Sequence, residues 1–493
     1  MKPWSLVRRV ARHPVGQNAA SLLGVQFATF ILPLLTLPYL SRVLEEHAFG
    51  VVLIAQGLAL VLGLLIDFGF EYTGARDVAQ SRGDDERIAA LAARILGARL
   101  LLILVATVAA IGALLVIEAL RAEPAIVAFA WLTAVAQGLY PGWFFVGHER
   151  LRLISLVQFV ARLTGVIGVF VLVAAPGDVW IAVACNALAT TAVCLVGTTL
   201  MYRRIPFRLP QLRRAPATLR ESTAVFAGTG AIAVYSSANV LVLGFFAPSG
   251  QVAQFGAAER IVRSLVQLMG PVAMAVFPRM ARLQSEGATD RARKLAFIAV
   301  GVLATGALTG AAVLALAAGW LVPFVFGADY EEGVGLLRIL VLILPLIGVT
   351  SVLAGGWMMA LRMDGAIVRS ALRAGATSLV LSLTLTPIFG PEGLAVSVVA
   401  AEIMALASCL WEIRRHGRSA GATTRHRPRS GYHSGRMRRR MMRALLGGVA
   451  AIVVVAVLAL VLIGGDDGPS GPRTPQLTGS GPLDYDRAVP LKV

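Results

Sequence analysis

Charged and amide side chains lie inside long apolar stretches of this chain, where they are rare. In one stretch Glu259, Arg260, Arg263 and Gln267 follow one another, and the last three fall on one face of a helix because they are three and four residues apart. Arg162 lies in another such stretch. An ionisable group at membrane depth either faces a water-filled cavity or pairs with another group. These residues are therefore the first candidates for a binding site.

Arginine in this position is suited to binding an anion, because the guanidinium group stays charged and meets phosphate through two parallel hydrogen bonds. We expect the arginines of both stretches to bind an anionic ligand, with Gln267 beside those of the second stretch. The alternative is a structural ion pair of an arginine with Glu259 or Glu402, and the sequence leaves both interpretations open.

Acidic and amide groups form a second set of candidates. Asp67 and Glu71 are four residues apart at the end of an apolar stretch, so we expect them on one face of a helix, with Arg76 after them. Glu402 lies alone in another apolar stretch. These four residues predict ion coupling or gating, or else pairing of the carboxylates with neighbouring arginines. Amides within the apolar stretches predict either a path for a polar glycan or bridges between helices; they are Asn18, Gln26, Gln56, Gln137, Gln158, Asn186 and Asn239.

Other kinds of chemistry have no support in the sequence. The six histidines do not combine with Cys, Asp or Glu at the spacing of metal ligands, and the three cysteines lie within apolar stretches. There is also no phosphate-binding loop of the Walker type and no HExxH. We therefore expect no cofactor, no metal and no enzymatic activity.

The composition predicts an all-α membrane protein with many spans. Hydrophobic residues make up 57% of the chain, charged residues 15%, and the mean hydropathy is +0.76. A helix needs about 20 residues to cross a bilayer, and helices satisfy their own backbone hydrogen bonds there. The spans are expected at 17–41, 48–70, 95–118, 125–147, 152–175, 178–201, 222–246, 255–279, 295–322, 334–361, 367–387, 391–413 and 444–464.

Positive charge is concentrated in every second loop, and eleven arginines lie between positions 414 and 443. Because basic loops stay in the cytoplasm during insertion, we expect a cytoplasmic N-terminus and an extracytoplasmic C-terminus. The net charge of +18 is then explained by orientation and by contact with anionic membrane lipids, so it does not indicate nucleic acid.

The first twelve predicted spans divide into two sets of six. The basic segment 202–221 separates residues 1–201 from residues 222–413, and both sets begin on the same side, as parallel repeats do. An offset of 206 residues also lays Phe49-Gly50 on Phe255-Gly256. We expect two parallel six-helix bundles around a central cleft, followed by a basic cytoplasmic segment (414–443), an extra transmembrane helix (444–464) and a polar extracytoplasmic tail (465–493).

Several short motifs resemble those of one transporter family. The first half contains PLLTLPYLSRVL at 33–44, FG at 49–50, DFGF at 67–70 and AR at 75–76. The second half contains NVLVLG at 239–244, FGAAER at 255–260, FPR at 277–279, FGADY at 326–330 and LRIL at 337–340. Over roughly residues 15–415 the chain resembles polysaccharide repeat-unit flippases (Wzx-type, O-antigen transporters) of the multidrug/oligosaccharidyl-lipid/polysaccharide exporter superfamily.

The resemblance implies alternating access and a cargo of undecaprenyl-pyrophosphate-linked oligosaccharide, carried across the bacterial cytoplasmic membrane for surface polysaccharide synthesis. It also implies contacts with a polysaccharide polymerase and assembly proteins. Relatives that flip the peptidoglycan precursor have a cationic cavity with arginines on helices 1 and 8. Arg260 and Arg263 match the second of these positions, whereas helix 1 here carries Asn18 and Gln26 and no basic residue.

Two other functions remain open at this point. One is a cation-coupled multidrug antiporter of the same superfamily, for which an acidic cavity lined by aromatic residues would be expected. Many family members have an acidic residue near Asn239, and this chain has none there. The other is a membrane scaffold in a glycan-assembly complex that transports nothing.

Overall fold

The computed structural model describes residues 35–423, and no residue in this range lies in a strand. Residues 35–43 are helical. The next helices form the N-terminal group: α3 (Glu45–Asp67), α4 (Phe70–Gln80), α5 (Asp85–Val116), α6 (Glu118–Arg121), α7 (Pro124–Leu139), α8 (Gly142–Gly147), α9 (Leu151–Leu172) and α10 (Val179–Tyr202). The C-terminal group has α11 (Ala215–Ser237), α12 (Asn239–Gly244), α13 (Ser249–Ser285), α14 (Thr289–Phe326), α15 (Gly333–Leu340), α16 (Ile343–Ser351) and α17 (Asp364–Thr423).

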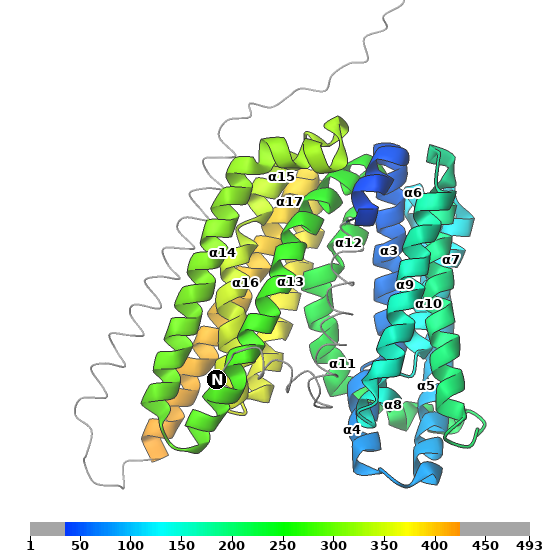
Figure 1. Ribbon diagram of the computed structural model, residues 1–493. Coiled ribbons are helices and arrows are strands. Elements are labelled where there is room, and N and C mark those ends of the chain that lie inside the picture. Colours follow the sequence, from blue (N-terminus) through cyan, green and yellow to red (C-terminus); the bar gives the residue numbers. More distant parts are fainter. Residues whose placement is uncertain (1–34, 424–493) are drawn as a thin grey trace, which may run out of the picture.

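The two groups stand side by side, with α11 and α12 at their boundary, and α13 also packs directly against α3 (Figure 1). Within the N-terminal group α7 packs against α3 and α10, and α9 packs against α10. Within the C-terminal group α14 packs against α13 and α16, and α11 packs against α17. The prediction of a helical membrane protein is confirmed, whereas the parallel repeat remains a prediction.

Eight helical segments between residues 45 and 416 are long and apolar enough to cross a membrane. The segment from 364 to 416 contains two of the predicted spans, 367–387 and 391–413, which meet at a kink at Gly390 (φ 57°). Two further predicted spans correspond to α11 with α12 and to α13. The span at 444–464 and most of the span at 17–41 lie outside the described residues.

One predicted span, 48–70, does not form a continuous helix. α3 ends at Asp67, and α4 begins at Phe70, because Phe68 (φ 48°) and Gly69 (φ 79°) adopt the left-handed conformation. Glycine reaches that region without a steric penalty, whereas a phenylalanine there is strained. The ring of Phe68 stacks on Phe226 of α11, with centroids 4.2 Å apart. This contact between the two helix groups accompanies the break.

A second predicted span, 125–147, is interrupted at Tyr140-Pro141, between α7 and α8. Proline has no backbone N–H to donate, and it forces the residue before it out of the helical region. Tyr140 accordingly has φ −53° and ψ 128°. The interruption frees the carbonyl groups at the end of α7 for other donors.

Close helix packing joins α3 to the C-terminal group along glycine positions. Gly50 lies against Ser249 at the start of α13, and Gly57 lies against Leu241 of α12. A side chain at position 50 would overlap the carbonyl oxygen of Ser249. Small residues allow helix backbones to approach in this way within membranes.

We expect Gly50→Ala to destabilise the protein by about 1–3 kcal/mol, because the added methyl group must push α3 and α13 apart. Gly310→Ala on α14 is the matched control, since nothing lies within 4 Å of its added carbon. Alanine favours a helix over glycine by about 1 kcal/mol, so the control should be neutral or stabilising. Thermal unfolding in detergent compares the two variants, and an equal response would contradict the packing argument.

Polar contacts connect the groups at the end of the molecule where α6 and α15 lie (Figure 1). Nδ1 of His47 is 2.5 Å from the hydroxyl oxygen of Ser249. The amide nitrogen of Gln254 donates to Glu46 at 2.8 Å, and the hydroxyl of Ser41 donates to the carbonyl of Phe326 at 3.0 Å. We call these contacts the polar latch.

The opposite end is joined by α11, which contacts α4 and α5. The hydroxyl oxygens of Thr73 and Ser222 are 3.0 Å apart and buried. Arg94 lies 3.7 Å from Glu221 in an exposed ion pair. The two ends of the molecule are thus connected by different helices, α13 at one end and α11 at the other.

Candidate functional site

A cavity of about 520 Å³ lies in the N-terminal group, between α3, α7, α9 and α10. Residues between 36 and 40 also line it, and α13 contributes one residue from the C-terminal group. Among apolar side chains, the lining includes four carboxamides and two arginines: Gln56, Gln137, Gln158, Asn186, Arg162 and Arg260. No acidic residue of the described chain is part of this lining. The cavity therefore offers positive charge together with hydrogen-bond donors and acceptors.

Arg260 joins the two helix groups at the cavity. Its Nη2 donates to Oε1 of Gln56 at 2.9 Å, which ties α13 to α3. Within residues 35–423 this is the only hydrogen bond that the structure gives to the Arg260 side chain. A guanidinium group has five N–H donors, so Arg260 retains donors for a ligand.

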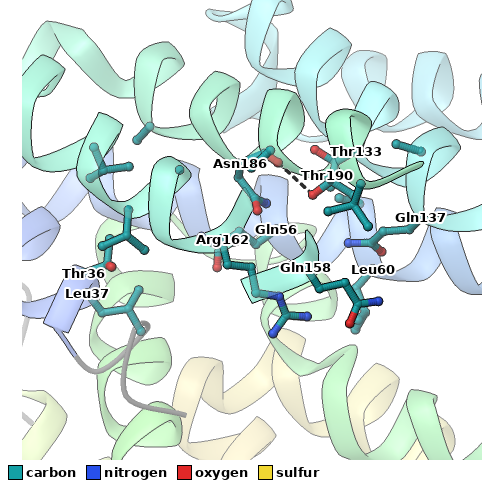
Figure 2. Close-up of a pocket in the computed structure, with 18 of the residues that line it drawn as sticks. Thr36, Leu37, Gln56, Leu60, Thr133, Gln137, Gln158, Arg162, Asn186 and Thr190 are labelled. Atoms are coloured by element: carbon teal, nitrogen blue, oxygen red, sulfur yellow. Dashed lines mark hydrogen bonds between the residues drawn. The ribbon is translucent and has the colours of Figure 1, made fainter. Parts of the chain in front are cut away.

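Arg162 supplies the second positive charge, from α9. It lies one turn after Gln158, and the two side chains extend from α9 toward the same side in Figure 2. Gln158 is hydrogen-bonded to Tyr140, at the break between α7 and α8. Asn186 and Thr190 of α10 are labelled on the other side of the cavity (Figure 2). The polar groups are thus distributed around the cavity and do not form a single stripe.

Arg263 has a different environment from Arg260. Its Nη2 lies 3.4 Å from Oε1 of Glu259, and the same oxygen accepts a hydrogen bond from Asn239 at 2.7 Å. Three residues of helix correspond to about 300°, so the two arginines point in directions about 60° apart. The structural ion pair that the sequence left open is therefore what the structure shows for Arg263. Gln267 is exposed on α13 and is not part of the cavity lining.

Glu402 of α17 is 3% exposed and interacts electrostatically with Arg263. Arg263 therefore has two carboxylates near it, those of Glu259 and Glu402, all within the C-terminal group. Arg260 also interacts electrostatically with Glu259, so two acidic and two basic groups lie together at this depth. A role of Glu402 in coupling or gating remains a prediction.

Asp67 and Glu71 do not lie on one face of a continuous helix, and this expectation was wrong, because the chain breaks between them at Phe68-Gly69. Asp67 instead accepts a hydrogen bond from Arg99 at 2.8 Å. The other terminal nitrogen of Arg99 donates to the carbonyls of Leu139 and Tyr140, at 3.2 and 3.3 Å. The predicted alternative, pairing of a carboxylate with an arginine, is thus what the structure shows for Asp67.

The remaining predicted residues lie apart from the cavity or outside the described range. Arg76 is exposed and lies 3.4 Å from Asp77. Glu71 is half-buried near Asp67 and Arg99. Asn18 and Gln26 precede residue 35 and lie outside the described residues.

Arg99 and Tyr140 were not selected from the sequence as site residues. Arg99 lies four residues after the start of the predicted span 95–118, and its exposure is only 3%. Tyr140 precedes a proline in the middle of a predicted span. The position of Arg99 inside a predicted span and the proline after Tyr140 can both be seen in the sequence, but neither shows which residue the side chain contacts.

The chain is similar to curated proteins along most of its length. Residues 15–284, more than half of the chain, match the family described as "Polysaccharide biosynthesis protein". A protein of Escherichia coli (strain K12) named "Putative O-antigen transporter" is 25% identical over 408 residues, which are 81% of this chain and 97% of that protein. A protein of Shigella dysenteriae with the same name is 24% identical over 79% of this chain and 97% of its own.

Solved structures show the same fold. A structure titled "Lipid II flippase MurJ, inward closed conformation" superposes with a TM-score of 0.60 and 13% identity, over 90% of this chain and 98% of that one. An inward-facing multidrug resistance MATE family transporter of the MOP superfamily gives a TM-score of 0.55 and 15% identity, over 83% and 99%. At these identities the likeness shows the fold alone.

The resemblance found in the sequence motifs is thereby confirmed at the level of the family. The structure is helical over its described length, it has eight segments able to cross a membrane, and its fold is that of MurJ and MATE transporters. The chain is a multi-pass membrane protein that belongs to the polysaccharide biosynthesis protein family.

Proposed function

We propose that this protein is a flippase that moves undecaprenyl-pyrophosphate-linked oligosaccharide from the inner to the outer leaflet of the bacterial cytoplasmic membrane. The observation that carries the proposal is the cavity lining, which has two arginines and four carboxamides without an acidic residue among the described ones. A pyrophosphate needs cationic partners within the membrane, and a glycan needs hydrogen-bonding groups. The names of the curated relatives support the same assignment.

Arg162 and Arg260 are the residues that would bind the pyrophosphate. They come from α9 and α13, in different helix groups, and both line the cavity. The lipid tail would remain in the bilayer while the polar head occupies the cavity. The protein would bind and move its cargo without making or breaking a covalent bond, and its partners would be the lipid-linked glycan and the proteins that polymerise it.

The cavity lining also argues against the alternative of a drug antiporter. Amphipathic cationic drugs favour acidic, aromatic-lined pockets, because carboxylates pair with the cation and aromatic faces stabilise it. The aromatic residue of the described lining is Tyr140, and both charged residues there are basic. An organic cation would therefore be repelled from this cavity.

Leaflet inversion of a fluorescent undecaprenyl-pyrophosphate oligosaccharide in proteoliposomes tests the proposal. We expect inversion that depends on the protein, measured by quenching of the fluorophore from outside, with and without a proton or sodium gradient. An amphipathic organic cation serves as the comparison substrate. Folded protein that moves the cation and not the lipid would favour the antiporter, and folded protein that moves neither would favour the scaffold.

Alternating access requires the polar latch to open when the cavity is exposed to the other side of the membrane. We expect that cross-linking His47→Cys to Ser249→Cys with a short bis-methanethiosulfonate, which forms a disulfide with each cysteine, abolishes inversion, and that a reductant that cleaves these disulfides restores it. The native cysteines Cys185, Cys194 and Cys409 are free thiols and would first be replaced. Undiminished inversion by fully cross-linked protein would contradict a moving latch.

A further inference from the structure

Carboxamide side chains line the cavity from each of the helices α3, α7, α9 and α10. Gln56 lies on α3, Gln137 on α7, Gln158 on α9 and Asn186 on α10. Each carboxamide has two N–H donors and a carbonyl acceptor. The cavity is therefore lined by groups that both donate and accept, from four directions.

Two of these amides have no partner within the described part of the protein. The side-chain oxygen of Gln56 accepts a hydrogen bond from Arg260, and the side chain of Gln158 is hydrogen-bonded to Tyr140. The structure gives no side-chain hydrogen bond from Gln137 or Asn186 to another residue of 35–423, and both side chains are exposed. A polar group without a partner inside a helix bundle is unfavourable unless water or a ligand satisfies it. These two amides are thus available to a ligand in the cavity.

We propose that this cavity binds the sugar residues next to the pyrophosphate, and that Gln137 and Asn186 select the glycan by hydrogen bonds to its hydroxyl groups. The inference rests on the proposed function and assigns the carboxamides a role separate from that of the arginines. A sugar hydroxyl donates one hydrogen bond and accepts others, which is the combination that a carboxamide satisfies.

The size and the apolar part of the cavity fit the same ligand. Small-molecule sites range from about 300 to 1,000 Å³, and the 520 Å³ here suits a few sugar rings and not a long glycan chain. Leu60 and Val193 also line the cavity, and apolar side chains can cover the C–H faces of a sugar ring. The remainder of a longer glycan would extend out of the cavity.

Equilibrium binding to purified protein separates the two roles. The probes are bare undecaprenyl pyrophosphate and the same lipid carrying one N-acetylglucosamine or one galactose. We expect wild-type protein to bind at least one sugar-bearing lipid about 5- to 30-fold more tightly than the bare lipid, the value for two modest hydrogen bonds. Combined replacement Gln137→Met and Asn186→Leu should reduce this preference to less than about threefold.

The matched control is Gln251→Met, which removes an exposed glutamine of α13 that does not line the cavity; it should keep the wild-type preference. Arg260→Gln should weaken all three lipids equally, because it acts on the pyrophosphate. Should the protein with Gln137→Met and Asn186→Leu fail to fold, Gln137→Ala with Asn186→Ala removes the same amides without added bulk.

Equal wild-type affinity for the three lipids, or a preference that survives loss of both amides, would overturn the inference. Leaflet inversion of the same lipids is measured in parallel. Inversion without any sugar preference would leave the flippase intact and remove the sugar site. A sugar preference in binding without inversion would support the sugar site and refute the transport function.

Discussion

Arg260→Gln is expected to reduce leaflet inversion of the lipid-linked oligosaccharide by about 10- to 100-fold, because a hydrogen bond to a charged group contributes about 1.5–3 kcal/mol. Arg260 lines the cavity and uses a single described hydrogen bond, to Gln56. Glutamine keeps a donor near that position but removes the positive charge. Arg162→Gln, on the facing helix group, should give a loss of the same size.

The two variants together should lose more than either alone if both arginines contact one pyrophosphate. The matched control is Arg338→Gln, since Arg338 is exposed on α15 and lies outside the cavity lining. Initial inversion rates are compared at equal amounts of folded protein in the proteoliposomes. Normal rates for both cavity variants would refute the anion site.

Arg263→Ala separately tests the prediction that Arg263 of α13 binds the anionic ligand. It would leave the buried carboxylate of Glu259 with Asn239 alone, so any loss of inversion should be accompanied by a lower unfolding temperature. A loss without destabilisation would mean that Arg263 also contacts the cargo.

Arg99→Met is expected to have the largest effect on stability, a loss of about 3–5 kcal/mol, because it leaves the carboxylate of Asp67 without its buried partner. The Arg99 side chain is 3% exposed and donates to Asp67 at 2.8 Å. It also donates to the last carbonyls of α7, at Leu139 and Tyr140. One side chain therefore connects α5, the end of α3 and the break between α7 and α8.

A double-mutant cycle isolates the ion pair from these other contacts. Asp67→Asn alone should destabilise the protein, and it should have a smaller effect when Arg99 is already methionine. Arg76→Gln is the control, because Arg76 is exposed and its ion pair with Asp77 is on the surface. Thermal unfolding in detergent compares the four proteins of the cycle and the control. Strict additivity of the two replacements would contradict a direct pairing of Arg99 with Asp67.

The sequence by itself determined the membrane class, the positions of most helices and the family. Each follows from a local property: an apolar run long enough to cross a bilayer predicts a span wherever it occurs. The sequence also limited the arginines at membrane depth to two interpretations, ligand binding or ion pairing, because a charged group at this depth requires one or the other. The motif at 33–44 was specific enough to identify the family.

Only the tertiary structure decided which arginine lines the cavity. Arg260 and Arg263 are three residues apart on one helix, and the spacing of four between Glu259 and Arg263 permits an ion pair without showing where a cavity lies. The cavity formed by α3, α7, α9 and α10 receives Arg260, whereas Glu259 and Glu402 lie beside Arg263. The sequence also did not show that Asp67 pairs with Arg99. Arg99 is distant from Asp67 in the sequence, and the helix break at Phe68-Gly69 does not indicate which arginine lies nearby. Pairing across helices depends on how the helices pack, and a single sequence does not specify that packing residue by residue.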